Sequence, residues 1–443
     1  MTRERDHRRD AVTIYEAALA GVEPGRALAR ALEGLEETGP RVACLALGKA
    51  AGPMIREALR QLDQRHIPVS HALAVLPNEE PAFDPRVVVA VGDHPLPGER
   101  SLAAARAVAV FARGVTPPDE VWVLLSGGTS SLIAAPVDGV SDADFSALHE
   151  ALHRAGLPIG ELNRVRKRFA RYGAGRLARA LTTPRIRVFA ISDVPGDDPA
   201  AIGSGPLEPD PTTARQVAEI LGRAMPPNRL PASVRAELER VIAGLAPETP
   251  KPGDPIFRRR TMEIIASNQV ALEHARRGAE SLGYLTDFVA LPLEREAADA
   301  GDFFGRLVSV LDADFPCCLL WGGETTVTLG DATGFGGRSQ ELALASAARI
   351  ESAAADAVVL AAGTDGRDGP TDAAGAIVDR DTWAAITRAG IDPAGSLAAH
   401  DSYSALRAAG ALIPARPTGT NVMDIVVGLR APVQNGGRPG GRM

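Results

Sequence analysis

Apolar runs that stop at glycine recur along this chain, and they constrain its fold more than any other feature. The clearest run is Val121–Leu125 (VWVLL), which stops at Ser126-Gly127-Gly128 and is followed by Thr129, Ser130 and Ser131. A short apolar run bounded by glycine is typical of a buried strand, and hydroxyl residues after it indicate a helix start. The stretch therefore predicts a strand that leads through a glycine loop into a helix.

Four further apolar runs end with glycine beside a polar or charged residue. Their endings are Gly48-Lys49, 192–198 (SDVPGDD), Gly322-Gly323-Glu324 and 363–369 (GTDGRDG). Strands that alternate with helices predict an α/β fold with mostly parallel sheets. Ligands of open α/β sheets bind outside the carboxyl ends of the strands, so these endings predict a cleft that handles anions and metal ions.

The length of the chain, 443 residues, predicts two domains, because it exceeds what one hydrophobic core typically supports. Proline and charge cluster at 247–255 (PETPKPGDP), which is the expected linker because this composition opposes regular structure. We therefore expect an N-terminal domain over 1–246 and a C-terminal domain over 256–430. The Gly/Arg-rich tail, 431–443, is expected to be disordered.

Composition and charge exclude several classes of protein. The formal charge of −7 argues against a nucleic-acid binder, and 4% aromatic residues argue against stacking platforms for single strands. Cys44, Cys317 and Cys318 lie inside apolar runs and are expected to be small core residues. The charged N-terminus lacks a secretory signal, and no apolar run approaches the ~20 residues of a membrane span, so we expect a cytoplasmic protein. The sequence does not set the oligomeric state, and a homodimer is compatible with it.

Two common nucleotide-binding motifs fail on spacing or context. A Walker A loop needs a Ser or Thr after its lysine, but Lys49 is followed by Ala50. A GxGxxA match at Gly173–Ala178 follows the basic segment RKRFARY instead of an apolar strand. The context of a dinucleotide-binding fingerprint is therefore missing.

The glycine loop and two strand-end residues are the first candidates for a site. In Ser126, Gly127, Gly128, Thr129 and Ser130, glycine allows backbone N–H groups to approach phosphate oxygens, although an ordinary capped turn explains the same residues. Lys49 is either a solvent-facing lysine or a cation for phosphate. Asp193, at the tip of a buried strand, loses hydration unless a cation, a donor or water compensates it. Glu324 occupies the same kind of position.

Cationic residues supply the second group of candidates. Arg338 at a helix start would face the positive end of the helix dipole unless an anion lay there, so the two together suit a carboxylate or a phosphate. A surface arginine is the alternative. The basic run 163–171 is expected to be a solvated helix face, with Arg166 or Lys167 as candidate phosphate contacts. His94 is a candidate base or a structural histidine.

Seven ordered motifs between residues 10 and 430 resemble the glycerate 2-kinase family with its MOFRL C-terminal domain. The motifs are ALGKAAGPM, GDHPLPGERS, LLSGGTSSL, ISDVPGDDPAAIGSGPLEPDPTT, WGGETTVTLGDATGFGGRSQELALA, AAGTDGRDGPTDAAGAIVD and PTGTNVMDIVVGL. The resemblance implies a Rossmann-like N-terminal domain, a second α/β domain and an active site in the cleft between them. It also implies an ATP-dependent, divalent-metal-dependent enzyme that phosphorylates the 2-hydroxyl of D-glycerate to 2-phosphoglycerate.

Site roles are carried over by the same resemblance. Lys49 and Arg338 would be the essential cations, with Asp193 and Asp365 lining the site. We hypothesise that the SGGTSS loop cradles nucleotide phosphates and that Asp193, with Glu324, holds Mg²⁺. Lys49 would neutralise the transferring group and Arg338 would pair with the glycerate carboxylate or the γ-phosphate. Asp365 would orient or deprotonate the 2-hydroxyl.

The chain departs from the family pattern at several positions. Tyr172 stands where a lysine is usual, His400 stands where asparagine is usual, and Arg416 replaces a glycine. The five charged residues of the expected site are retained, so the reaction class is expected to be kept, while the acceptor pocket is expected to differ in shape. An NAD(P)H-dependent hydroxypyruvate reductase and a non-catalytic sugar-acid-binding protein are the alternative functions.

Overall fold

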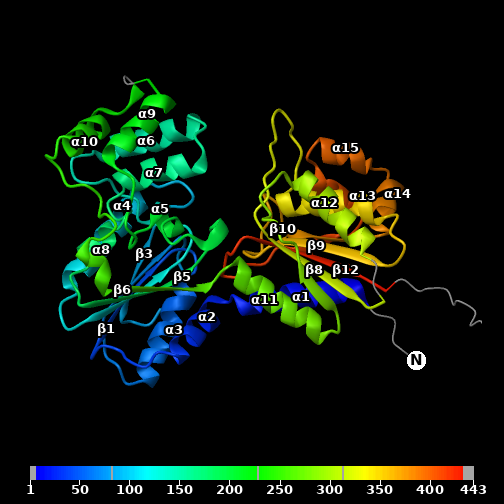
Figure 1. Cartoon of the computed structure of the whole chain (residues 1–443), viewed down its shortest axis with the longest axis horizontal. Coiled ribbons are helices and arrows are strands. Elements are labelled where there is room, and N and C mark those ends of the chain that lie inside the picture. Colours follow the sequence, from blue (N-terminus) through cyan, green and yellow to red (C-terminus); the bar gives the residue numbers. More distant parts are fainter. Residues whose placement is uncertain (1–5, 81–82, 227–228, 312–313, 433–443) are drawn as a thin grey trace, which may run out of the picture. The chain divides into compact units, whose positions relative to one another are not determined.

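The chain forms two compact units, each with its own β-sheet and core. The computed structural model describes residues 6–80, 83–226, 229–311 and 314–432. Pro24–Ile265 form one unit, called here the N-terminal unit, and Met1–Glu23 with Ala266–Met443 form the C-terminal unit (Figure 1). The predicted α/β fold is confirmed in both.

The sheet of the N-terminal unit is built from the runs that the sequence predicts as strands. Its strands in the described residues are β1 (Val42–Leu47), β2 (Val69–Leu76), β3 (Val87–Val91), β4 (Glu120–Leu125), β5 (Arg185–Ile191) and β6 (Arg260–Ala266). They are ordered β3-β2-β1-β4-β5-β6, and the pairs among β1 to β5 are parallel. Every residue of β1 and β4 is buried, which explains why these strands are apolar on both faces.

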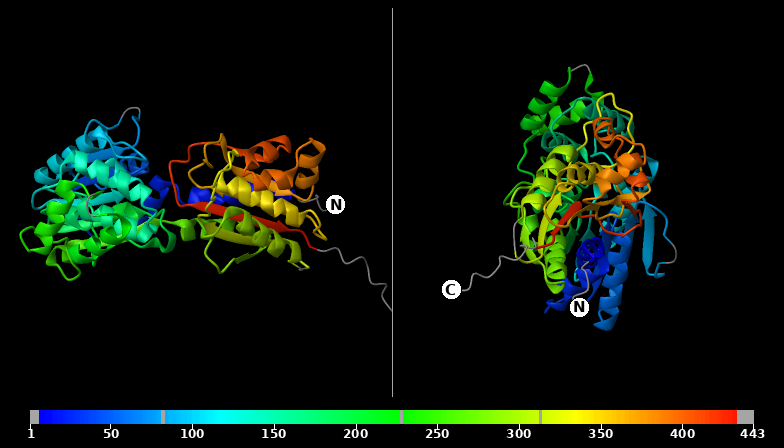
Figure 2. Two further views of the ribbon diagram at one scale, coloured as in Figure 1. Left: turned by 90° about the horizontal axis from the view of Figure 1, so that it is seen from above. Right: turned by 90° about the vertical axis from the view of Figure 1, so that its right-hand side faces the viewer.

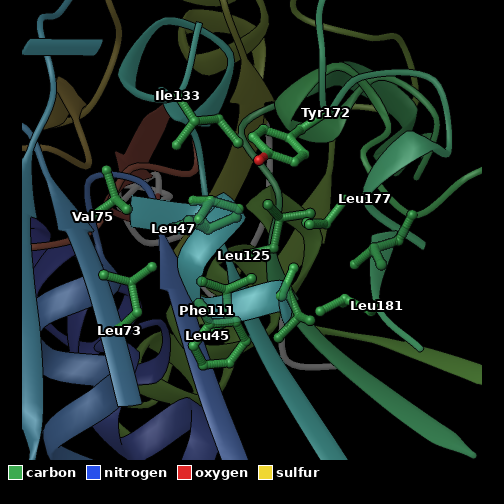
Figure 3. Packing of buried hydrophobic residues seen from close by; sticks show 14 of the residues in the cluster. Leu45, Leu47, Leu73, Val75, Phe111, Leu125, Ile133, Tyr172, Leu177 and Leu181 are labelled. Atoms are coloured by element: carbon green, nitrogen blue, oxygen red, sulfur yellow. The ribbon is translucent and has the colours of Figure 1, made fainter. Parts of the chain in front are cut away.

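Helices cover this sheet, with α3 on β1 and β2 and α4 on β2 and β3. The helices near the sheet are α2 (Pro24–Glu33), α3 (Ala51–Gln64), α4 (Glu99–Gly114), α5 (Thr129–Leu132) and α8 (Arg176–Ala180). The core on the α4 side is shown in Figure 3, where alternate residues of each strand, such as Leu45 and Leu47, point to the same side. Phe111 of α4 packs against them.

A separate helical layer completes the N-terminal unit. It consists of α6 (Asp142–Arg154), α7 (Ile159–Phe169), α9 (Ala214–Ala224) and α10 (Ala232–Ile242). These helices contact one another and bury a core that includes Phe145, Leu148, Val217 and Leu238. Short 3₁₀ turns, η1 (Pro195–Asp197), η2 (Ile202–Ser204) and η4 (Pro255–Arg259), lie in the connections.

The sheet of the C-terminal unit is mixed, which corrects the expectation of a mostly parallel sheet there. Its strands in the described residues are β7 (Leu285–Phe288), β8 (Cys317–Gly323), β9 (Ala357–Gly363), β10 (Ala373–Asp379), β11 (Leu412–Pro414) and β12 (Asp424–Arg430). The order is β11-β10-β9-β12-β8-β7, and only β7–β8 among the described pairs is parallel. The last strand enters the middle of the sheet antiparallel to both neighbours, and strand–helix alternation in the sequence cannot show this direction.

Two helix pairs pack on this sheet. The helices of the unit are α1 (His7–Gly21), α11 (Asn268–Ser281), α12 (Ala297–Val310), α13 (Arg338–Ile350), α14 (Thr382–Arg388), α15 (Pro393–Ala398) and α16 (Ser402–Ala408). Helix α12 packs on α13, and α1 packs on α11 (Figure 1). Figure 2 shows α1, in blue, close to β12, in red, and the two elements are in contact.

The compact units do not coincide with the predicted domains 1–246 and 256–430. The first helix belongs to the C-terminal unit, where the Tyr15 hydroxyl donates a hydrogen bond to the carbonyl of Gly363 at 2.6 Å. The expected linker, 247–255, is bonded within the N-terminal unit, since Asp210 donates its N–H to the carbonyl of Pro250 at 2.9 Å. Strand β6 then extends the N-terminal sheet. Of the predicted disordered tail, residues 433–443 lie outside the described residues.

The sequence expectation that the cysteines are core residues is met in the described chain. Cys44, Cys317 and Cys318 are buried free thiols, and burial raises the pKa of Cys44 to about 12. None of the described helices combines the length and the apolar character needed to cross a bilayer.

We expect Phe111→Ala to lower the free energy of unfolding of the N-terminal unit by about 3–5 kcal/mol, because it empties a closely packed site in the core. Val110, the preceding residue of α4, is 62% exposed, while Phe111 is 5% exposed. Val110→Ala is therefore the matched control, with an expected change below about 0.5 kcal/mol. Urea unfolding of both variants makes the comparison, and equal losses would contradict the assigned core.

Candidate active site

The carboxyl ends of β1 and β4 lie side by side and bring two glycine turns together. Leu47 and Leu125 are paired in parallel register, so each strand ends at the same level. Lys49 donates its N–H to the carbonyl of Gly127 at 2.9 Å, and Ala50 donates its N–H to Ser126 Oγ at 3.0 Å. These bonds hold the Lys49 turn against the SGGTSS loop.

Glycine is required here because the chains approach more closely than a side chain allows. A Cβ at Gly127 would lie 1.9 Å from Oδ2 of Asp193. Gly48 has φ +114°, and a Cβ there would lie 2.5 Å from the carbonyl oxygen of Ser126. Both glycines therefore permit contacts that any other residue would break.

The SGGTSS loop offers a row of unpaired donors. In the described part of the chain, no acceptor pairs with the N–H groups of Gly127, Gly128, Thr129 or Ser130. The Ser130 hydroxyl lies 2.7 Å from that of Ser204, which η2 presents to it. Successive free N–H groups on a glycine turn form a concave site for an anion.

Lys49, Asp193 and His94 share one electrostatic environment beside this loop. Asp193 is half-buried, and burial raises its pKa while the charge of Lys49 opposes the rise. Burial and the same lysine lower the pKa of His94. Asp193 forms no ion pair within 4.0 Å among the described residues, so its carboxylate is available to a cation from solution.

Arg338 lies in the C-terminal unit with two carboxylate partners. Its Nε and Nη2 donate to the Asp424 carboxylate at 2.5 and 3.0 Å, and its Nη1 lies 2.6 Å from Glu324 Oε1. Asp424 is 3% exposed, and burial raises its pKa despite the arginine. Asp424 was not among the site residues predicted from the sequence. It directly precedes an apolar run, whereas Asp193 lies at the end of one.

The start of α13 corrects the expectation that Arg338 and the helix N-terminus together bind an external anion. The Asp368 carboxylate accepts the N–H groups of Ser339 at 3.1 Å and Gln340 at 2.8 Å. This carboxylate accepts free N–H groups of the first helical turn, and its negative charge stabilises the positive end of the helix dipole. Asp368 was also missed, because only Asp365 was selected from the GTDGRDG segment.

Asp365 lies close to this ion-pair cluster. Its Oδ1 accepts the N–H of Arg367 at 3.0 Å, and it flanks Gly363 together with Asp424. Tyr15, whose hydroxyl is bonded to the carbonyl of Gly363, approaches from α1, and burial raises its pKa. The carboxylates of Asp424 and Glu324 thus contact the guanidinium of Arg338, and Asp365 lies beside Asp424.

The predicted site residues therefore fall into two groups. Lys49, Asp193 and the loop residues 126–130 converge in the N-terminal unit, and Arg338, Glu324 and Asp365 converge in the C-terminal unit. Their roles in catalysis stay predictions.

The residues of the N-terminal group fit a magnesium ion better than those of the C-terminal group. Among the described residues, no cluster of three or more His, Cys, Asp or Glu side chains could hold a metal by itself. Magnesium is commonly held by one or two carboxylates with substrate phosphates and water. The unpaired carboxylate of Asp193 fits this pattern, whereas Glu324 is paired with Arg338.

Of the other cationic candidates, Lys167 is paired within the protein. Lys167, proposed as a phosphate contact, is buried and lies 3.2 Å from Asp210 Oδ1. Arg166 is half-buried, and burial lowers its pKa. The GxGxxA match at 173–178 follows a turn, and Gly175 packs against Phe257 instead of a ligand.

Known proteins match almost the whole chain, and two family models match separate parts of it. Residues 10–239 match a domain of unknown function, DUF4147, and residues 317–424 match the MOFRL family. A glycerate 2-kinase from Pyrococcus horikoshii is 36% identical over 96% of this chain and 97% of its own. A putative hydroxypyruvate reductase from Agrobacterium vitis is 37% identical over 93% and 92%. A glycerate kinase structure from Thermotoga maritima superposes with a TM-score of 0.85 at 32% identity, covering 96% and 99% of the two chains.

We expect Asp368 to make stability depend on pH. Burial and the nearby Asp424 raise its pKa to about 6. Because this value lies above the unfolded value of about 3.9, the protonated form favours folding, and its contribution is lost as pH rises through 6. The free energy of unfolding of the wild type minus that of Asp368→Asn should fall by at most about 3 kcal/mol between pH 4 and pH 7.

Urea titrations across this pH range measure the difference. Asp356→Asn is the control, since the Asp356 side chain is 72% exposed and should give no such trend. A difference that stays constant or rises with pH for Asp368→Asn would show that its carboxyl titrates normally.

Proposed function

The chain belongs to the glycerate 2-kinase family, and on that premise we propose that it transfers the γ-phosphate of ATP to the 2-hydroxyl of D-glycerate. The products would be 2-phosphoglycerate and ADP. The observation that carries the proposal is the row of unpaired N–H groups at 127–130, which lies beside the cation of Lys49 and the carboxylate of Asp193. Phosphoryl transfer depends mainly on such positioning and charge neutralisation, with little covalent chemistry from the protein.

In this mechanism the SGGTSS loop binds nucleotide phosphate oxygens through backbone N–H groups. Lys49 offsets the charge that gathers on the transferring group. Asp193 would hold Mg²⁺, which neutralises phosphate charge when it is bound. The tight contact between Gly127 and Asp193 fixes the carboxylate relative to the loop.

The C-terminal cluster is proposed to recognise the acceptor. An arginine has five N–H donors, and three contacts of Arg338 to Asp424 and Glu324 leave donors for the glycerate carboxylate. The 2-hydroxyl oxygen would attack the γ-phosphorus as the bond to ADP breaks, and Asp365 would accept the hydroxyl proton. The position of Arg338 depends on Asp424, so Asp424 is a positioning residue.

The reductase reading has weaker support. Two relatives bear the name of a putative hydroxypyruvate reductase. The glycine match at 173–178, however, follows a turn, and a dinucleotide site of this type requires a preceding strand. A protein that only bound a sugar acid would not need the unpaired N–H groups at 127–130 to bind nucleotide phosphates.

The decisive experiment incubates the enzyme with ATP, Mg²⁺ and D-glycerate and follows ADP release, with the product examined by ³¹P NMR. We expect phosphate on the 2-position. Lys49→Ala should lower kcat by about 10²–10³-fold, the usual cost of removing such a stabilising group. Arg338→Lys tests the second cluster without leaving Asp424 unpaired, and Arg154→Ala, on the exposed surface of α6, is the control.

A 3-phosphate product would overturn the regiochemistry alone. Glycerate binding without ADP release would favour the binding protein, and NADH consumption with hydroxypyruvate would favour the reductase.

Gly127→Ala is expected to lower kcat/KM by about 10²-fold, because its Cβ would displace Asp193 by more than an ångström. Gly222→Ala in α9 is the matched control, since no atom lies within 4 Å of the added Cβ. Steady-state kinetics of both variants provide the measurement. Full activity in Gly127→Ala would remove Asp193 from the mechanism.

A further inference from the structure

A cavity lined by arginine lies within the N-terminal unit, apart from the site described above. It has a volume of about 510 Å³ and lies among α4, α8 and α10. Its described lining includes the arginines Arg113, Arg171, Arg176, Arg179 and Arg240. We call it the arginine cavity. Neither Lys49, Asp193 nor any SGGTSS residue lines it.

The positive charge of the arginine cavity is only partly offset by the protein. Arg171 pairs with Asp138 at 2.8 Å and Arg240 pairs with Glu237 at 2.7 Å. Arg179 has a longer contact of 3.6 Å with Asp254. Asp138, Glu237 and Asp254 are the carboxylates that form ion pairs with these arginines in the described chain. Five guanidinium groups are therefore paired with only three carboxylates, although the net charge of the protein is −7.

The two remaining arginines have no carboxylate partner among the described residues. Arg113 is exposed on α4 and forms no ion pair. Arg176 donates to the backbone carbonyls of Lys167, Ala170 and Arg168. These bonds fix Arg176 but do not neutralise it. Burial and the charge of Arg168 lower its pKa to about 10, as expected for a cation among other cations.

The wall between these arginines is rigid. Tyr172 is buried, and its hydroxyl donates to the carbonyl of Ala105 on α4 at 3.1 Å. This bond ties the α8 side of the cavity to the α4 side. The volume of the cavity lies within the ~300–1,000 Å³ typical of small-molecule sites.

We propose that the arginine cavity binds a small organic anion that carries two phosphate groups. Guanidinium groups bind phosphate through two parallel N–H donors, and the arginines of the cavity lie on different elements, Arg113 on α4 and Arg176 on α8, so two phosphate groups can be bound separately. A ligand with two such groups would engage Arg113 and the remaining donors of Arg176, neither of which has a carboxylate partner among the described residues, and would compete with Asp138 for Arg171. This site is independent of the proposed kinase reaction.

Isothermal titration calorimetry tests the proposal, with fructose 1,6-bisphosphate as the probe. The titrated protein is full-length Lys49→Ala, in which the catalytic phosphate site is weakened. We expect saturable binding that falls by at least about tenfold when Arg113→Ala and Arg171→Ala are added, since both substitutions remove charge-assisted hydrogen bonds to the phosphate groups. Arg154→Ala, which removes one exposed charge elsewhere, should leave the affinity unchanged.

One further variant and one further ligand test the proposed site. Arg179→Glu reverses one charge at a half-exposed side chain and should weaken binding without touching the core. Inorganic phosphate should bind more weakly than the bisphosphate, and equal affinity would overturn the two-group ligand. Unchanged bisphosphate affinity in the arginine variants, or loss of binding in Lys49→Ala alone, would overturn the site itself.

Discussion

The parallel pairing of β1 with β4 is the constraint on which the N-terminal site depends. The register ends both strands at the same level, so their following turns meet and share hydrogen bonds. Two apolar strands supply this alignment, and two glycines remove the side chains that would keep the turns apart. The chemistry at the strand ends is therefore held in place by the hydrophobic packing of the sheet.

The C-terminal cluster follows a different principle. Asp424 is buried, and a buried carboxylate needs a partner to compensate the hydration it loses. Arg338 supplies that partner through two parallel contacts and also reaches Glu324. The guanidinium is thereby fixed in orientation, while its net attraction for another anion is reduced. Such an arrangement favours a small ligand of defined geometry over general attraction of negative charge.

The sequence predicted the local elements and the glycine turns well, because strand burial and glycine spacing are local signals. Lys49, Asp193 and loop 126–130 converge as the strand ends indicated. The partners of Arg338 were not predictable in this way, since Asp424 lies far along the chain and joins it only through the antiparallel entry of β12. The role of Asp368 was not predictable for a similar reason. Its carboxylate accepts hydrogen bonds from backbone N–H groups of α13, a separate element of the chain.

The path of the chain through the C-terminal unit has a consequence for synthesis on the ribosome. Helix α1 is made before the N-terminal unit, yet its apolar residues pack against elements made after residue 266, including β12. The central position of β12 means that the sheet cannot close until Asp424–Arg430 have been made. The N-terminal unit is continuous in sequence and can form earlier, since domains generally fold as units during synthesis. Until α11, β9 and β12 have been made, the apolar residues of α1 lack their native packing partners. Chaperones or transient contacts would then shield these residues from water.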